Sequence, residues 1–405
     1  MKQVADYDIA IIGAGLAGLS LATRLAEPAF AGLRVLVLEP RTQYRRDRTW
    51  SYWSMTPHPF QAAVTSSFDR WRVVSRERSV IRGAPGLRYE SIPSDRLYQI
   101  ALERLRAAPQ IEFRQGVSVQ ASEHSSVQAS GHSSVQASGH SDSVQLRFGT
   151  QTARARHAFD TRPPARLASH GLSQRFLGWE IETPDDVFDP STVTLMDFRC
   201  PQAGAAHFTY ILPFTSRRAL VEDTWFAPPG LEQPDHEAAI RDYLVGCHGV
   251  TRFEILFEER GALPMNPIFR PVAGRRLLPI GMAGGGARPS TGYAFNAIQA
   301  QCDTIAADLL AGRTPRPVRP RPRIVRTMDR VLLDMMYRQP ELAAPLFTSL
   351  FDRCEPQALV RFLNDRASLP DLLAVGLAMP VMTTSLATLH LLMEPTRWTR
   401  HSIAG

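Results

Sequence analysis

The chain has 405 residues, 44% of them hydrophobic, and a formal net charge of +7. This length exceeds what one compact core needs, so two or three subdomains are expected, and the apolar content excludes a wholly disordered protein. The charge comes mostly from arginines spread along the chain, without a basic helix of the kind that binds nucleic acid, so we expect no nucleic-acid partner. A membrane surface or a phosphorylated cofactor explains the charge better.

The cysteines and the first residues bear on the cellular compartment. The four cysteines lie far apart and form no Cys-x-x-Cys pair, so neither a disulfide framework nor a structural zinc site is predicted. The first apolar run already belongs to the first predicted strand, so we expect no signal peptide. The expected location is the cytoplasm, peripheral on the inner face of the cell membrane.

Residues 7–39 predict a strand, a glycine-rich turn, a helix and a second strand. Gly13 permits the tight turn, Gly15 lets the backbone approach a pyrophosphate, and Gly18 lets the helix pack close to the sheet. The helix N-terminus offers free N–H groups and a partial positive charge to phosphates. Glu39 closes the second strand, where an acid accepts a hydrogen bond from a ribose hydroxyl.

This pattern favours a dinucleotide site over a plain glycine-rich turn, because both strands and the acid accompany the glycines. The unit begins almost at Met1, so by analogy with N-terminal flavoprotein domains we expect FAD rather than NAD. The residues expected to contact the cofactor here are Gly13, Ala14, Gly15, Gly18 and Glu39.

Arginines then gather directly before a group of aromatic residues, in the sequence RTQYRRDRTWSYW at residues 41–53. This segment is either a solvated loop that ends in core aromatics, or it brings an arginine to the cofactor phosphates and the aromatics to a flavin or an apolar substrate. Further along, Ser94 is predicted to cap a helix that extends through Leu105.

Residues 118–145 form an internal repeat with a period of eight, which places His124, His132 and His140 at equivalent positions. A metal-binding histidine ladder is one interpretation, but no acidic or cysteine ligands accompany the histidines. A duplicated, flexible polar loop between two strands is preferred, and we expect no metal.

The middle of the chain is rich in predicted strands. The alternating stretch at 145–160 predicts an edge strand, and residues 178–229 predict four strands that roof over a substrate cavity. A helix is expected at 237–245, followed by a strand at 253–258 and a turn at 261–265.

A second glycine-rich turn follows a short strand at 277–281 and returns the chain to the nucleotide-binding domain. The next helix is expected from about Tyr293 to Gly312, with its N-terminus pointing at the flavin. A stiff Pro/Arg connector at 313–323 leads to a helical tail. The apolar stretch 369–393 carries polar interruptions, so two short helices meeting at Pro380 are preferred over a membrane span.

Motifs in the same order throughout the chain resemble those of the bacterial lycopene cyclases, a family of FAD-binding enzymes. The stretches that carry the resemblance are 48–53 (RTWSYW), 176–180 with 195–197, 208–214 with 219–224, 261–264, 288–293, 328–333, and 350–353 with 361–363. The resemblance covers almost the whole chain apart from the repeat. Related flavoproteins carry Gly-Asp-Ala where this chain has Gly281-Met282-Ala283, and bacterial cyclases also tend to lack that acid.

The resemblance implies an α/β fold in which a Rossmann-type, glutathione-reductase-like FAD-binding domain holds an inserted antiparallel sheet and is followed by a helical region. The expected parts are 1–175 and 269–320 for FAD, 176–268 for the substrate sheet, and 321–405 for the C-terminal helices. It also implies a cyclisation without net oxidation, an isomerase-type reaction that converts the ends of lycopene or a similar linear carotene to β-ionone rings. Reduced FAD would be the active form, with NAD(P)H as electron donor.

The resemblance also implies roles for individual residues. Glu222, in the motif 221–224, would be the proton donor, with Asp223 beside it in the same acidic motif on the opposite face of the strand, bracing the backbone or arginine neighbours. The alternative is that Glu222 is an exposed acid paired with Arg217 or Arg218. Cofactor contacts are implied for Arg48, Thr49, Gly281, Met282, Pro289, Ser290, Thr291, Gly292 and Tyr293, and substrate contacts for Trp50, Trp53, Tyr210, Trp225 and Phe226.

Two rival functions share the flavin motifs. One is an FAD-dependent monooxygenase or polyene reductase that acts on an apolar isoprenoid, and the other is a flavin-binding scaffold protein without activity. The sequence leaves the ring type, the number of rings formed and the oligomeric state open.

Overall fold

The computed structural model describes residues 5–123, 143–163, 171–232, 235–266, 275–317 and 321–379. The repeat histidines, the residues from Pro380 onward and part of the Pro/Arg connector lie outside these ranges, so the predictions made for them stay predictions. In the part of the chain that is described, no helix has the length and apolar character needed to cross a bilayer.

The first sheet carries the glycine-rich turn. Its strands run in the order β8-β2-β1-β11-β10-β9, and β17 also pairs with β11. The parallel strands of this sheet are β8, β2, β1, β11 and β17. Strand β10 pairs in antiparallel fashion with both β11 and β9. The strands are β1 (Ala5–Ile12), β2 (Val35–Glu39), β8 (Ile111–Gln115), β9 (Val119–Glu123), β10 (Val144–Phe148), β11 (Gln151–Asp160) and β17 (Leu277–Pro279).

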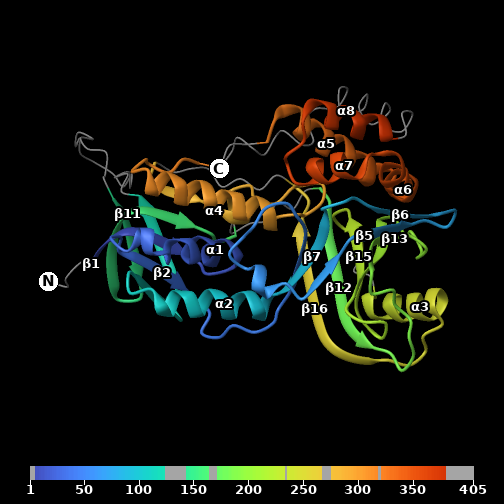
Figure 1. The fold of residues 1–405 in the computed structure, drawn as a ribbon, viewed down its shortest axis with the longest axis horizontal. Helices are drawn as coiled ribbons and strands as arrows, with labels where there is room; N and C mark the ends of the chain where they lie inside the picture. The colour runs from blue at the N-terminus through green and yellow to red at the C-terminus, as the bar shows by residue number, and fades with distance from the viewer. Residues whose placement is uncertain are drawn as a thin grey trace.

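Helices α1 (Leu16–Leu25), α2 (Ser94–Ala107) and α4 (Phe295–Leu310) pack together beside this sheet (Figure 1). The prediction that 145–160 forms an edge strand is wrong. β11 lies inside the sheet, because β1 pairs with residues 153–160 along one side, and β10 and β17 pair with residues 151–155 and 158–160 along the other. Exposed and buried residues alternate in this strand only as far as Arg156, and its last four residues are all buried.

The glycines of the turn have the packing roles that the sequence predicts. Gly13 has a positive φ of 89°, and a Cβ at Gly18 would stand 1.9 Å from the carbonyl oxygen of Gly13. Gly281 also has a positive φ, and a Cβ there would be 2.7 Å from the Cβ of Ala17. The second glycine-rich turn therefore rests directly on helix α1.

The second sheet is predominantly antiparallel and has the order β16-β12-β15-β14-β13-β5-β6. Two of its strands come from the N-terminal third of the chain, and β13 pairs with β5 in parallel. The strands are β5 (Arg70–Val74), β6 (Ser79–Gly83), β12 (Ser173–Glu182), β13 (Thr192–Asp197), β14 (Ala206–Pro213), β15 (Arg218–Ala227) and β16 (Glu254–Pro264).

Helix α3 (His236–His248) covers one face of this sheet, and the C-terminal helices stand on the other side (Figure 1). These are α5 (Arg323–Arg338), α6 (Ala343–Arg353), α7 (Pro356–Leu363) and α8 (Leu369–Ala378). A three-stranded sheet of β3 (Thr49–Ser54), β7 (Arg88–Pro93) and β4 (Ser66–Phe68) lies at the junction of the two large sheets.

Two local predictions are corrected. Residues 261–265 do not form a turn, because β16 continues to Pro264, and the missing side chain of Gly261 admits the ring of Phe176. Ser94 is not the cap of α2 but its first residue; the cap position is Pro93. The Ser94 hydroxyl instead accepts hydrogen bonds from the backbone N–H groups of Asp47 and Arg48, at 2.9 and 3.2 Å.

A buried ion pair joins the second glycine-rich turn to the C-terminal helices. Arg288 is 1% exposed, and its Nε donates to Asp329 Oδ1 of α5 over 3.0 Å. It also donates to the carbonyl of Phe362 in α7. Ser290 donates to the same carboxylate oxygen at 2.7 Å.

Replacing Asp329 with alanine removes the nearest carboxylate from a guanidinium that stays buried. We expect the apparent free energy of unfolding in urea to fall by about 3 kcal/mol, as for other broken buried ion pairs. The control is Arg313→Ala, which removes an arginine that is 56% exposed in its pair with Asp308, and its expected cost is under ~1 kcal/mol. Equal losses in the two variants would contradict the structural importance of the buried pair.

Candidate functional site

The candidate site lies on the face of the second sheet that points away from helix α3. Gly178 of β12 is directly opposite Glu222 of β15 on one side and Glu259 of β16 on the other, and Tyr210 of β14 lies opposite Glu222. Directly opposed residues project to the same face of a sheet. Tyr210, Glu222, Gly178 and Glu259 therefore form one row across four strands.

Glu222 is buried in this row, with 9% of its surface exposed. Thr224 Oγ1 donates a hydrogen bond of 2.6 Å to its Oε1. Burial raises the pKa of Glu222 to about 7, and the hydrogen bond from Thr224 opposes this rise. The alternative of an exposed acid is wrong, because Arg218 pairs with Glu180 and Arg217 pairs with Asp186.

Glu259 is a second buried carboxyl group that the sequence interpretation did not single out. It is 5% exposed, and Thr49 Oγ1 donates to its Oε2 over 3.0 Å. Burial raises the pKa of Glu259 to about 8, and the charge of Glu222 raises it further, against Thr49 and the nearby Arg46 and Arg48. The predicted strand ended at Glu258. A strand predicted to run to Pro264 would have included Glu259, which lies level with Glu222 because both are opposite Gly178.

Strand β3 covers the row from the nucleotide-binding side. Its alternate residues Thr49 and Ser51 contact Glu259 and Tyr210, the latter through a 3.1 Å hydrogen bond from the tyrosine hydroxyl to Ser51 Oγ. The next residue on that face, Trp53, packs edge-on against Tyr89 and Tyr293, at ring-centroid distances of 4.9 and 5.3 Å. Two sheets and the second glycine-rich turn therefore enclose the carboxyl groups.

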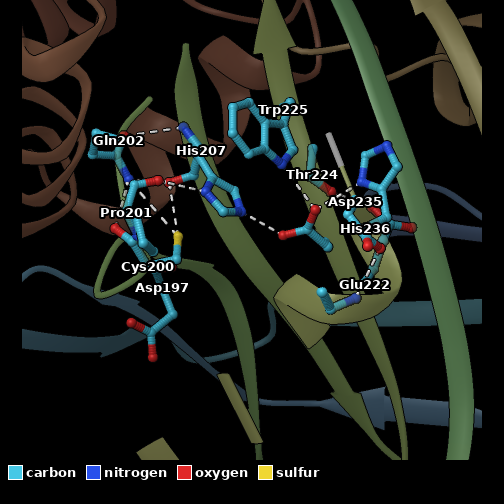
Figure 2. Close-up of polar contacts among 12 residues, drawn as sticks. Asp197, Cys200, Pro201, Gln202, His207, Glu222, Thr224, Trp225, Asp235 and His236 are labelled. Atoms are coloured by element: carbon cyan, nitrogen blue, oxygen red, sulfur yellow. Dashed lines mark hydrogen bonds and ion pairs between the residues drawn. The ribbon is translucent and has the colours of Figure 1, made fainter. Parts of the chain in front are cut away.

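Asp223 projects to the opposite face, as predicted, but its partners are not arginines. His236 Nδ1 lies 2.7 Å from its Oδ2, Trp225 Nε1 donates to the same oxygen over 2.8 Å, and His207 contacts the other oxygen. Figure 2 shows these two histidines and the indole converging from three sides. Burial would raise the pKa of Asp223, but the hydrogen bonds from His207 and His236 outweigh it and lower the pKa.

The first glycine-rich turn fits an anionic ligand. Gly15 caps helix α1 without a side-chain hydrogen bond, and the nearest atom to a Cβ there would be Arg41 Nη2, at 4.0 Å. The backbone N–H groups of the first turn are thus open to a phosphate. Glu39, at the end of β2, accepts from the N–H of Ala14 and from Arg41, and its oxygens keep lone pairs for a ribose hydroxyl.

Arg41, rather than the predicted Arg48, is the arginine that contacts this turn, since its Nη2 donates to the carbonyl of Ala14 over 2.9 Å. Arg48 pairs with its neighbour Asp47 at 2.9 Å. Thr49, predicted as a cofactor contact, bonds to Glu259 instead. The sequence alone could not tell which arginine of the cluster turns back toward the glycines, and the predicted cofactor contact of this cluster stays a prediction.

The second glycine-rich turn brings its predicted residues to the edge of the row. Gly292 has a positive φ of 72°, and a Cβ there would stand 3.0 Å from Gln174 Oε1 of β12. Its N–H and that of Arg288 close the turn through bonds of 2.8 and 2.9 Å to the carbonyls of Arg288 and Tyr293. Met282 lies in a short helical turn, Gly281–Ala283, and Pro289, Ser290 and Thr291 complete the loop. Helix α4 begins at Phe295, two residues after the expected start.

Two of the five predicted substrate contacts, Tyr210 and Phe226, share the face of Glu222, and a third, Trp53 of β3, belongs to the same apolar cluster. Trp225 does not, because strand alternation turns it with Asp223 to the α3 side, where it stacks on His207. Trp50 alternates away from Thr49 and packs edge-on against Tyr98 of α2. Residues close in sequence, such as Thr49 and Trp50, therefore project from opposite faces of their strand.

The fold is that of flavoproteins. A geranylgeranyl bacteriochlorophyll reductase-like protein from Thermoplasma acidophilum has a TM-score of 0.60 at 12% identity, with 95% of this chain and 99% of that chain covered. Aklavinone-11 hydroxylase, solved with FAD and aklavinone, has a TM-score of 0.54 at 17% identity, covering 89% and 69%. The predicted FAD-binding α/β fold with an inserted sheet and C-terminal helices is confirmed.

Sequence relatives narrow this fold to one family. The lycopene beta-cyclase of Pantoea ananas is 27% identical over 322 residues, which is 74% of this chain and 74% of that protein. The lycopene beta-cyclase of a Paracoccus species is 28% identical over 315 residues, 74% and 73% of the two chains. The family model described as lycopene cyclase protein matches residues 8–389. This chain belongs to the lycopene cyclase family, as its motifs predicted.

Proposed function

We propose that this chain is a flavin-dependent lycopene cyclase, which converts the linear ends of lycopene or a similar carotene to β-ionone rings without net oxidation. The observation that carries the proposal is Glu222, a carboxyl group that is 9% exposed and has a pKa raised to about 7 by burial. About half of such groups carry the proton at neutral pH, and the protonated form can give it to an alkene.

The reaction begins when Glu222 protonates the terminal double bond of the carotene. The internal double bond attacks the resulting carbocation, which closes the ring, and a ring proton is then lost. Tyr210 and Trp53, on the same face, offer aromatic rings to the cationic centre. β3 and the second sheet exclude water, which would otherwise trap the cation.

The apolar cluster next to Glu222 suits a hydrocarbon substrate. Phe208 and Phe226 pack edge-on at 5.2 Å on the same sheet, and this cluster continues into the C-terminal helices. Arg46 and Arg218 pair with Glu180, two residues from Gly178 on β12, and lie on the side of Glu222 away from Phe208 and Phe226. The end of a linear carotene would enter from the side of the apolar cluster.

FAD is the cofactor that the two glycine-rich turns suit. Gly13, Ala14, Gly15 and the start of α1 would hold the pyrophosphate, Glu39 the ribose, and the loop 289–293 the flavin ring. When bound in its reduced, anionic form, the flavin supplies negative charge that stabilises a carbocation in a dry site, and NAD(P)H would supply its electrons.

A membrane surface is the expected source of the carotene, with the chain on its cytoplasmic face. Helix α8 presents Leu369, Leu373 and Leu377, which are 72%, 68% and 76% exposed. Their spacing of four residues places them on one side of the helix. An exposed leucine stripe of this kind suits the boundary between lipid headgroups and acyl chains.

The first test concerns flavin binding. Gly18→Ala forces a Cβ against the carbonyl of Gly13, so we expect the purified protein to lose most of its bound FAD, measured by absorbance of the isolated protein. The control is Gly32→Ala, because nothing lies within 4 Å of a Cβ at Gly32. Full FAD occupancy in the first variant would contradict the proposed phosphate site.

The second test concerns ring closure in cells that accumulate lycopene. The natural chain should convert lycopene to cyclic carotenes, identified by chromatography and mass spectrometry, whereas Glu222→Gln should reduce conversion by about 10²–10⁴-fold and keep its flavin. The control is Glu258→Gln, since Glu258 bonds to the indole of Trp179 on the other face. Oxygenated or saturated products would favour a monooxygenase or reductase instead.

The third test concerns the membrane. Replacing Leu373 and Leu377 with glutamate should lower co-sedimentation of the full chain with anionic lipid vesicles at least several-fold, because the helix loses its apolar face. Val245→Glu is the control, since Val245 is 50% exposed on helix α3, on the opposite face of the sheet. Unchanged sedimentation of the leucine variant would refute the role of α8.

A further inference from the structure

Two buried carboxyl groups flank one glycine in the candidate site. Gly178 lies opposite Glu222 on β15 and opposite Glu259 on β16. A Cβ at position 178 would stand 3.2 Å from Cγ of Glu259 and 3.5 Å from Cβ of Glu222. The absent side chain of Gly178 is therefore the space over which the two glutamates approach each other.

Neither carboxyl group forms an ion pair with an arginine, lysine or histidine in the described ranges, although Arg46 and Arg48 lie near Glu259. Glu180, two residues from Gly178 on the same face, differs in that it holds two arginines. Ionising both of these buried carboxyl groups would cost free energy through desolvation and through repulsion between the two charges, so one of them keeps a proton.

We propose that Glu259 is the second catalytic carboxyl group of the ring closure, sharing one proton with Glu222 and accepting the proton that the ring loses. This inference rests on the proposed cyclase function. The pairing of β15, β12 and β16 places both carboxyl groups on one face beneath β3, with Gly178 between them.

The proton count balances over one ring. The O–H bond of Glu222 breaks and a C–H bond forms at the terminal alkene, and the ring then closes by forming a C–C bond. A ring C–H bond breaks, its electron pair becomes the new double bond, and the proton passes to the Glu259 carboxylate. Transfer from Glu259 back to Glu222 restores the starting state, and no oxidant or reductant is consumed.

The surrounding groups leave these two carboxyl groups as the pair that titrates near neutral pH. Arg46 and Arg48 are the basic groups near Glu259, and burial raises the pKa of Tyr89, Tyr210 and Tyr293 well above the ordinary value. Asp223, with a lowered pKa, faces His207 and His236 on the other side of the sheet. Burial raises the pKa of Glu222 to about 7 and of Glu259 to about 8, so the pair holds a proton in this range. A single proton on the pair therefore lies mostly on Glu259, and it passes to Glu222 before Glu222 gives it to the alkene.

The test is the pH profile of ring formation, kcat/KM, by the flavin-loaded full chain with lycopene in lipid vesicles. The natural chain should give a bell, because activity requires one proton on the pair. In Glu259→Gln the rate at the optimum should fall by about 10²–10⁴-fold. The acidic limb should disappear, and the alkaline limb should move to lower pH because Glu222 loses a repelling neighbour.

Glu258→Gln, one residue away on the opposite face, should keep both limbs. If Glu259→Gln also kept both limbs in their original positions, the proposal would be overturned even if the variant were slower or less stable, since a structural role does not move a pH profile. A loss of the acidic limb together with the shift of the alkaline limb would support it.

A second measurement does not depend on ring formation. Infrared difference spectra of the substrate-free, flavin-loaded protein should show a protonated carboxyl band that titrates near neutral pH and that Glu222→Gln and Glu259→Gln each change. Ring formation with a band that neither variant changes would overturn the shared proton alone. The shared band without any ring formation would overturn the cyclase function and leave the carboxyl pair in place.

Discussion

The candidate site depends on the exclusion of water from carboxyl groups at the seam between β3 and the second sheet. In the described part of the chain, three buried glutamates of the second sheet lie on that face, and their partners differ. Glu180 is neutralised by Arg46 and Arg218, whereas Glu222 and Glu259 accept hydrogen bonds from the hydroxyl groups of Thr224 and Thr49. Because an unpaired buried carboxylate costs several kcal/mol, on the order of the whole stability of many domains, the second pair favours the protonated form.

Strand alternation separates two neighbouring acids into opposite chemical states. Glu222 and Asp223 adjoin in sequence, but Glu222 accepts one hydroxyl donor whereas Asp223 receives two histidines and an indole. Burial raises the pKa of the first, and hydrogen bonds lower that of the second against burial. An acid and a permanent anion can therefore coexist within one motif, and the anion fixes α3 to the back of the sheet.

The sequence predicted the parts of this protein whose signals are local. The glycine spacing and the strands between residues 178 and 229 follow from local patterns, whereas the role of Glu222 was expected from the family resemblance, and β5 and β6 of the second sheet were not predicted. Glu259 was not singled out, because the predicted strand ended at Glu258 and a turn was predicted at 261–265. The strand in fact continues to Pro264, and Gly261 admits the ring of Phe176. Trp225 was assigned to the wrong face for a related reason, since only the register of β12, β14 and β15 fixes which alternate residues look inward.

The loop 288–293 links the walls of the site, which explains why its residues are constrained from several sides. Gly292 abuts Gln174 of the substrate sheet, while Arg288 and Ser290 bind Asp329 of the C-terminal helices. The same loop leads into α4, which packs on α1 of the nucleotide-binding sheet. A cofactor held by this loop would therefore have a position fixed relative to the carboxyl row and the apolar cluster together, so that cofactor binding and the geometry of the acid would be coupled through one short segment.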